Sequence, residues 1–399
     1  MSKHNSHQTY GSVAKTFHWL TALLIFTVIP LGLIAHKIPL DTTEQIARKA
    51  WLFSAHKTVG ITLFFVALAR ILWAIRQPRP RLLNADKPLE SFLAETVHYT
   101  LYASLVIVPL MGWAHHAATT GFAPIWWPLG QGLPFIPKDA SLAETFALLH
   151  MVFERVLLVS LILHIAGAIK HHVIDKDATL RRMLPGTVEL PPLAPSASHL
   201  RPALMAAAIY GAVFAGVAAA GGLSHAEAQN TEKLEAVASE WSVETGTLDI
   251  SVNQFGSVVD GGFSDWTAAI TFDDTDPRAE QVGSVEVLIN IASLSLGSVT
   301  DQAKGPDYFN QEQFPTAVFS GPILRATDGY IVDGSLTLKG NTLPLTLPFA
   351  LTIDGDSAQM SGQTTINRLD FGIGENQPDE TNLGFEVAVR VALTARKSQ

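Results

Sequence analysis

The 399-residue sequence predicts a two-part fold: an all-α bundle of membrane-spanning helices followed by an all-β antiparallel barrel. Five apolar stretches long enough to cross a bilayer all lie before residue 224. Alternation of apolar and polar residues, which is typical of half-buried strands, begins only at Trp241. The charge changes at the same place. Residues 1–223 contain 18 Lys and Arg against 11 Asp and Glu, a net charge of +7, whereas residues 224–399 contain 9 against 25, a net charge of −16.

The composition excludes several classes of site. The chain has no cysteine, so it cannot form disulfides, thiolate-held iron–sulfur clusters, thiol nucleophiles or covalently attached c-type haem. Only 16% of the residues are charged, against about 25% in ordinary soluble domains, and 48% are apolar. All 14 histidines lie at or before His225. Chemistry that needs imidazole therefore belongs to the membrane half.

Each predicted span has about the 20 apolar residues that a bilayer core requires. The spans are residues 18–36, 56–75, 98–117, 148–170 and 203–223. The first is too long for a cleaved signal peptide and has no small-residue site behind it. The short segments on the N-terminal side of the membrane hold 11 Lys and Arg and those on the opposite side hold 4, which predicts a cytoplasmic N-terminus. Five spans then deliver the acidic half to the periplasm of a bacterial inner membrane.

Four histidines have the spacing of two ligand pairs. His150 and His164 are 14 residues apart on the fourth span, which brings them within about 40° of one helix face and about 21 Å apart along it. His18 opens the first span on the cytoplasmic side, and His56 opens the second on the periplasmic side. Depth therefore pairs His18 with His164 and His56 with His150. Two stacked bis-histidine sites suit two b-type haems, although a lone membrane histidine more often makes a helix–helix hydrogen bond.

Other polar residues near the span ends have several roles open to them. Arg70 follows His56 by 14 residues, and it could pair with propionates of the inner haem or snorkel to lipid phosphate. Lys57 and Arg155 are similar candidates at the outer haem, with Glu154 neutralising Arg155. Further histidines could replace a ligand or carry protons near a quinone: His36, His98, His115 and His116.

Small and solvated positions complete this half. Gly60 and Gly167, one turn after His56 and His164 in the chain, would let a ring approach the backbone. His171 and His172 are expected to belong to a solvated cytoplasmic helix end.

Residues 10–186 resemble the bacterial cytochrome b561 family, a four-helix di-haem membrane cytochrome. The resemblance is carried by Phe17-His18-Trp19-Leu20, His56 with Gly60, Leu149-His150, Leu163-His164 and Leu180-Arg181-Arg182-Met183-Leu184-Pro185. It implies two haem b groups with ligands at the same four histidines, and electron transfer between a periplasmic partner and the quinone pool. Superoxide oxidation with ubiquinone as acceptor is an activity that the resemblance implies. His98 also matches a histidine of that family, without a clear role.

A proline-rich connector, residues 187–202, precedes the fifth span. The span itself, residues 203–223, is rich in Ala and Gly, as packed membrane helices often are. Arg201 before it and Ser224-His225-Ala226 after it also resemble an internal signal sequence with a cleavage site. We expect the helix to be retained as an anchor, whereas cleavage would release the acidic half as a separate periplasmic protein.

The acidic half predicts antiparallel strands. Leu248, Ile250 and Val252 alternate with polar residues, and turns such as Asp260-Gly261-Gly262 separate the runs. About 160 residues of this kind favour a closed barrel with room for one elongated ligand, crossed by a short helix at 301–309. Candidate lining residues, for which plain core is the commoner role, are Phe255, Phe263, Trp266, Phe309, Phe314, Phe319 and Phe349.

Residues 240–397 resemble the YceI family, a lipocalin-like periplasmic barrel that binds polyisoprenoid lipids. The resemblance is carried by Gly261-Gly262-Phe263, Asp307-Tyr308-Phe309, Gly334-Ser335-Leu336-Thr337-Leu338-Lys339-Gly340 and Arg368-Leu369-Asp370-Phe371-Gly372. The early histidine common in that family is missing, and Phe255-Gly256-Ser257 stands near its place. The resemblance implies an isoprenoid ligand.

The sequence thus predicts four parts: a cytochrome-like domain at 1–186, a linker at 187–202, a fifth membrane helix at 203–223 and a barrel at 240–397. The leading hypothesis is a di-haem cytochrome that moves electrons between a periplasmic donor, superoxide being one candidate, and ubiquinone, whose isoprenoid tail the barrel binds. A second is a lipid-binding or stress-response barrel on a haem redox-sensing anchor. A third is a transporter whose histidines relay protons. A nucleic-acid partner is not expected.

Overall fold

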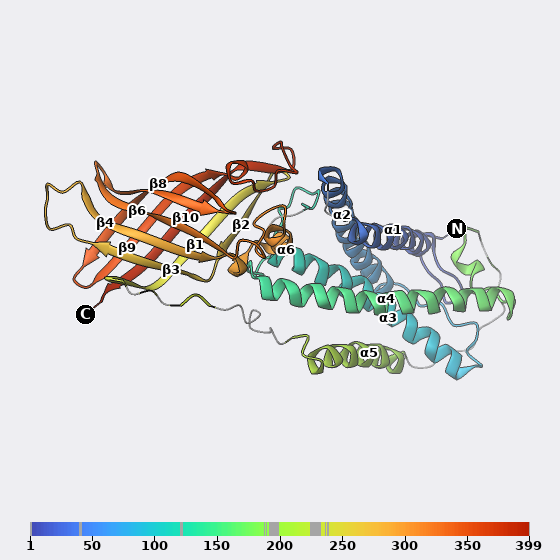
Figure 1. Cartoon of the computed structure of the whole chain (residues 1–399). Coiled ribbons are helices and arrows are strands. Elements are labelled where there is room, and N and C mark those ends of the chain that lie inside the picture. Colours follow the sequence, from blue (N-terminus) through green and yellow to red (C-terminus); the bar gives the residue numbers. More distant parts are fainter. Residues whose placement is uncertain are drawn as a thin grey trace. The chain divides into compact units, whose positions relative to one another are not determined.

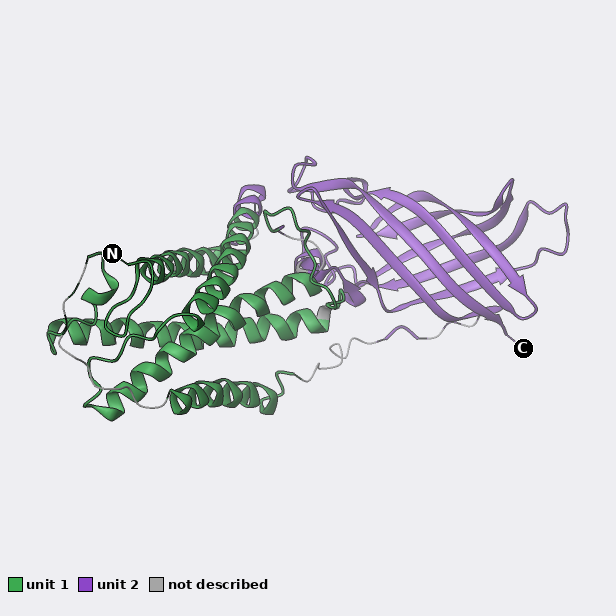
Figure 2. Ribbon diagram, turned by 180° about the vertical axis from the view of Figure 1, so that it is seen from behind, with its two compact units in different colours: residues 1–38, 49–118, 125–225 green, residues 39–48, 119–124, 226–399 purple. Residues whose placement is uncertain are grey.

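The structure is a computed structural model of the whole chain. It describes residues 2–39, 42–119, 123–186, 188, 190, 199–223, 233–235, 237 and 239–398. Most of the proline-rich connector and the cleavage-like site at 224–226 lie outside these residues. The chain forms two compact units, one helical and one containing the sheet (Figure 2).

Five helices in the described part of the chain are long and apolar enough to span a membrane (Figure 1). They are α1 (Ser12–Lys37), α2 (Thr43–Ile75), α3 (Pro88–Ala118), α4 (Ala140–Val173) and α5 (Leu200–Ala219). The five predicted spans correspond to them one by one. The last helix ends four residues before its predicted end because the chain turns at Gly221, whose φ of +78° is a conformation that favours glycine.

The helical unit packs through apolar side chains and a few internal polar contacts. α3 and α4 run side by side, and α5 lies against α3. Tyr210 on α5 joins a cluster that contains Val108 and Phe153, and its hydroxyl lies 2.6 Å from the fully buried Ser104 Oγ of α3. A buried hydroxyl pair of this kind ties two helices where water cannot serve as a partner. The fifth helix is therefore part of the packed helical unit.

The other unit is one antiparallel sheet of ten strands in the order β3-β4-β6-β7-β8-β9-β10-β1-β2-β5. The strands are β1 (Trp241–Gln254), β2 (Ser257–Phe263), β3 (Trp266–Phe272), β4 (Gln281–Asn290), β5 (Leu294–Ser295), β6 (Thr316–Ala326), β7 (Gly329–Leu338), β8 (Asn341–Asp354), β9 (Ser357–Asn367) and β10 (Leu383–Lys397). The short helices here are η2 (Ile291–Ser293), η3 (Gly297–Val299), α6 (Thr300–Lys304) and η4 (Arg368–Phe371).

The sheet curls until β3 approaches β1. A Cβ placed on Gly246 of β1 would come within 2.7 Å of the Trp266 ring of β3. No strand ladder joins these two strands within the described residues, so the antiparallel sheet is confirmed but its hydrogen-bonded ring is open on this side. The predicted crossing helix is shorter than expected, because α6 ends at Lys304 and Gly305 begins a run of turns.

Candidate functional site

The outer histidine pair lies between α2 and α4. The rings of His56 and His150 have centres 6.2 Å apart and planes at 89°. Two imidazoles that bind one metal ion from opposite sides, each through a nitrogen at about 2 Å, have centres about 6 Å apart. The spacing therefore fits one iron between these two side chains.

Each of these two rings is oriented by a main-chain carbonyl. His56 Nδ1 lies 2.8 Å from Val28 O of α1, and His150 Nδ1 lies 2.8 Å from Val108 O of α3. A carbonyl only accepts a hydrogen bond, so each Nδ1 carries the proton and donates. The lone pair of each imidazole is then on Nε2, the nitrogen left for a metal.

Two glycines make room for these contacts. A Cβ on Gly32 would lie 2.8 Å from Cε1 of His56, and a Cβ on Gly112 would lie 2.9 Å from Cε1 of His150. Each glycine follows by four residues the valine whose carbonyl the histidine uses, so both lie on the same helix face as that carbonyl. Sequence reasoning missed them. The signal was the pair of proline-containing runs Val28-Ile29-Pro30-Leu31-Gly32 and Val108-Pro109-Leu110-Met111-Gly112.

The inner site contains three imidazoles rather than two. His18 of α1 and His164 of α4 have ring centres 6.1 Å apart, with planes at 59°. His98 of α3 lies closer to His164, at 5.0 Å between ring centres. Arg70 Nη2 lies 3.4 Å from His18 Nδ1, and its guanidinium carbon is 5.1 Å from the centre of the Tyr102 ring. Arg70 thus lies beside the predicted ligand His18. A guanidinium in this place could also form a salt bridge with a haem propionate.

The structure places the other polar residues predicted near the span ends in different surroundings. Lys57 Nζ lies 3.2 Å from His116 Nδ1, whose Nε2 is 3.0 Å from Gln131 Oε1, so these three form a polar cluster. Arg155 is paired with Glu154 at 3.2 Å, and its side chain is 60% exposed. His36 is exposed at the end of α1, and His115 Nδ1 lies 2.9 Å from Ala143 O.

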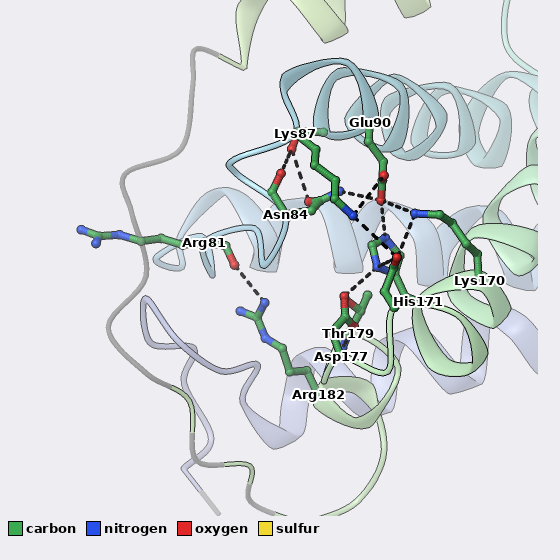
Figure 3. Close-up of polar contacts among 11 residues, drawn as sticks. Arg81, Asn84, Lys87, Glu90, Lys170, His171, Asp177, Thr179 and Arg182 are labelled. Carbon is green, nitrogen blue, oxygen red and sulfur yellow. Dashed lines mark hydrogen bonds and ion pairs between the residues drawn. The ribbon is translucent and has the colours of Figure 1, made fainter.

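The ends of α3 and α4 are joined by a polar cluster of Glu90, Lys170, His171, Asp175 and Asp177 (Figure 3). Lys170 Nζ lies 2.7 Å from Glu90 and 2.8 Å from Asp175, and its hydrogen bond holds the pKa of Asp175 below the ordinary value. His171 is 9% exposed and lies 2.7 Å from Asp177, so its prediction as a solvated residue was wrong, whereas the neighbouring His172 is exposed as predicted. Glu90, His171 and Asp175 could surround a metal ion, but the Lys170 ammonium already donates a hydrogen bond to each of the two carboxylates.

The sheet encloses an apolar cavity of about 240 Å³. Of the seven aromatic residues predicted to line a lumen, five do so: Phe263, Trp266, Phe309, Phe319 and Phe349. Phe255 and Phe314 are not among the lining residues. Phe255 occupies the β1–β2 turn with φ +50°, and the Phe314 ring lies where a Cβ on Gly340 would be. The sequence pattern does not distinguish inward aromatic residues from those that pack under turns.

A few polar side chains line the same cavity: Gln254, Gln302, Tyr308, Thr364 and Arg368. Burial raises the pKa of Tyr308 and lowers that of Arg368. Arg368 is 2% exposed and donates to the main-chain carbonyls of Ile373, Gly374, Gln377, Leu383 and Gly384. This arginine therefore holds the loop after η4. The sequence motif that contains Arg368 was identified, but this structural role was not predicted from it.

Two family models match separate parts of the chain. Residues 9–186 match prokaryotic cytochrome b561, and residues 234–395 match the YceI-like domain. Cytochrome b561 homolog 2 of Escherichia coli (strain K12) is 32% identical over 189 residues, which are 46% of this chain and 95% of that protein. The probable superoxide oxidase CybB of Yersinia pestis is 26% identical over 180 residues, which are 45% of this chain and 97% of that protein.

Solved structures match the second part. The crystal structure of BcnA from Burkholderia cenocepacia has 29% sequence identity and a TM-score of 0.35, and the match covers 37% of this chain and 95% of that chain. Both resemblances found in the sequence are thus confirmed by the family models. The second part of the chain is a YceI-like domain. The chain is an integral membrane protein that belongs to the prokaryotic cytochrome b561 family, and this membership implies haem b and electron transfer in the membrane.

Proposed function

We propose that this protein is a di-haem cytochrome of the bacterial inner membrane that passes electrons from a periplasmic donor to ubiquinone. The observation that carries the proposal is the outer pair, in which both His56 and His150 are held by Nδ1 with Nε2 left for iron. His18 and His164 would hold the second haem. A bound haem supplies one-electron chemistry at its iron.

The chain's own residues orient the proposed ligands. The carbonyls of Val28 and Val108 fix the tautomer and direction of the outer imidazoles, which also raises their basicity as ligands. Arg70, between His18 and Tyr102, is suited to neutralise an inner propionate. His98, beside His164, is a second candidate for the inner ligand pair.

Superoxide is the donor that we favour. Giving up one electron converts it to O₂, and two such electrons with two protons reduce one ubiquinone to ubiquinol. One relative is named a probable superoxide oxidase. In this chain Lys57 follows the outer ligand His56 and contacts His116, so a basic side chain lies near the side where an anionic donor would arrive.

The second unit would bind the isoprenoid tail of the same quinone. Its cavity is apolar on nearly all of its surface, as a hydrocarbon chain requires. The acidic unit would lie in the periplasm, with the N-terminus in the cytoplasm, as the loop charges predict. In this arrangement residues 1–186 carry electrons, residues 203–223 are retained as a fifth span, and residues 240–397 store or present quinone.

The test is the reduced-minus-oxidised absorption spectrum of the purified protein, with haem quantified per chain. We expect two b-type haems in the wild type, and one in either His56→Ala or His18→Ala. His36→Ala is the matched control, because His36 is exposed and should leave both haems in place. A full haem complement in His56→Ala would contradict the ligand assignment. Well-folded protein from haem-replete cells without haem would contradict the whole proposal.

Electron transfer is measured separately with superoxide as donor and a short-chain ubiquinone as acceptor. We expect the rate of quinone reduction to fall at least tenfold in His56→Ala, because this variant loses a proposed haem ligand, and to stay unchanged in His36→Ala. A tenfold change in rate corresponds to about 1.4 kcal/mol of activation free energy. An equal rate in the wild type, His56→Ala and His36→Ala would contradict a role of the haems in electron transfer to quinone. It would favour the redox-sensing alternative.

A further inference from the structure

One inward position of the curled sheet breaks the apolar pattern of its strand. Along β1 the cavity is lined by Leu248, Ile250 and Val252, and the next inward residue is Gln254. Its side chain is only 7% exposed, and its Oε1 atom has no hydrogen-bond partner among the described residues. A buried amide oxygen without a partner is costly, so this position calls for a hydrogen-bond donor inside the cavity.

The neighbouring polar side chains of this end hydrogen-bond to one another or to the main chain. Gln302 Nε2 lies 3.2 Å from Tyr308 Oη, to which Gln377 also donates. Arg368 commits its guanidinium to main-chain carbonyls, including that of Leu383, the residue that pairs with Gln254 across β1 and β10. Among the described residues that line this end, Gln254 has a buried side-chain atom without a hydrogen-bond partner.

This end of the cavity is closed, whereas the opposite end reaches the surface. Val299, Ala303 and Ile373, all buried, line the cavity beside Gln302 and Tyr308. At the other end Ile353 also lines the cavity and is 44% exposed. Strand register places Ile353 at the level of Ala358, Ala395 and then Val243, next to Trp241 at the start of β1.

The two ends are far enough apart to separate the head from the tail of a lipid. Trp241 and Gln254 are the first and last residues of a 14-residue strand, which extends over about 40 Å. Trp241 Nε1 is the other lining atom here without a partner in the described residues. The indole nitrogen can only donate a hydrogen bond, whereas the free amide oxygen of Gln254 can only accept one.

We propose that the cavity binds its isoprenoid lipid head-first, with Gln254 Oε1 accepting a hydrogen bond from an uncharged hydroxyl head group and the tail extending toward Trp241. This inference rests on the proposed isoprenoid-binding function of the second unit. Among the described residues that line the cavity, Arg368 alone carries a charge, and its donors are used by carbonyls. A diphosphate head group would be buried without a free counter-charge, so a prenol or a quinol, each with a hydroxyl donor, fits and a prenyl diphosphate does not.

The affinity test uses the full-length protein and three probes: geranylgeraniol, geranylgeranyl diphosphate and the head-free hydrocarbon squalene. In the wild type, geranylgeraniol should bind at least tenfold more tightly than the diphosphate. Gln254→Leu keeps the approximate size of the side chain and removes its hydrogen-bonding atoms. It should therefore lower the affinity for geranylgeraniol roughly tenfold and leave the affinity for squalene unchanged. Asn253→Leu makes the same change at the exposed neighbouring position of β1, which does not line the cavity, so it is the matched control and should change neither affinity.

Orientation is tested with a geranylgeraniol analogue that carries a photoreactive group beside the hydroxyl, in wild-type protein and with mass-spectrometric mapping of the crosslinks. If the head group lies beside Gln254, we expect the crosslinks to map to residues 248–263 and 296–309. Labels at 241–243 and 351–358, or a loss of affinity in Trp241→Phe but not in Gln254→Leu, would overturn the head-first orientation. Equal affinities of Gln254→Leu and wild type would overturn the role of Gln254 alone. Failure of the wild type to bind any of the three probes would instead overturn the proposed lipid-binding function.

Discussion

Two residues without side chains determine whether the outer histidines can be oriented. His56 and His150 reach the carbonyls of Val28 and Val108 across helix surfaces on which Gly32 and Gly112 leave space. The glycines predicted from the sequence, Gly60 and Gly167, have a different proposed role, which is to let a porphyrin ring approach the backbone, and that role stays a prediction. A Cβ on Gly167 would meet no described atom within 4 Å, and one on Gly60 only Val28 Cγ2 at 3.7 Å. The space that the imidazoles need is on the facing helices, which chain distance from a histidine does not predict.

Gly32→Ala or Gly112→Ala should therefore weaken the outer haem selectively. The added methyl group would overlap the imidazole, rotate it away from its carbonyl and misdirect Nε2. Loss of such an orienting contact costs about 10- to 100-fold in affinity for the metal group. The measurement is haem content and the midpoint potentials of the two haems. Gly211→Ala on α5 is the control, since its Cβ would meet nothing within 4 Å. Unchanged outer haem in both variants would contradict the orienting role.

At the scale of elements, apolar content predicted which helices exist but not how far they extend. α2 begins at Thr43, 13 residues before the predicted span, because Arg48 and Lys49 exclude this part from any apolar window while still permitting helix. The strands of the second unit followed from their alternation. The polar position Gln254, the closeness of His98 to His164 and the open edge at β3 depend on contacts between distant segments, which periodicity within one element does not contain.

The cluster that joins the ends of α3 and α4 should make the stability of the helical unit depend on acid pH. The pKa of Asp175 is held below its ordinary value of 3.8 by the hydrogen bond from Lys170. A carboxyl whose folded pKa is lowered stabilises the fold above its ordinary pKa, and this contribution is lost as the pH falls through the folded pKa. Asp175→Asn should therefore lower the melting temperature slightly at pH 7 and not at pH 2. An equal decrease at both pH values would show that packing, rather than charge, is what the substitution removes.

At the scale of the whole molecule, the absence of cysteine makes the topology directly testable. Thr275 and Arg76 are both exposed, the first in the loop between β3 and β4 and the second directly after α2. With five retained spans and a cytoplasmic N-terminus, these residues lie on opposite sides of the membrane. A membrane-impermeant maleimide should label Thr275→Cys in intact spheroplasts, and Arg76→Cys only after permeabilisation, with no background from the parent chain.

The size of the labelled product tests the fifth helix in the same experiment. Tyr210 and Ser104 join α5 to α3 through a buried hydroxyl pair, a contact that a transient signal segment would not need. We therefore expect the label on Thr275→Cys to run with the full-length chain. Label on a fragment of about half that length would mean that the chain is cut after α5. Retention matters for the proposed electron transfer, because a tethered quinone-binding unit meets the outer haem at an effective concentration that a released unit would not reach.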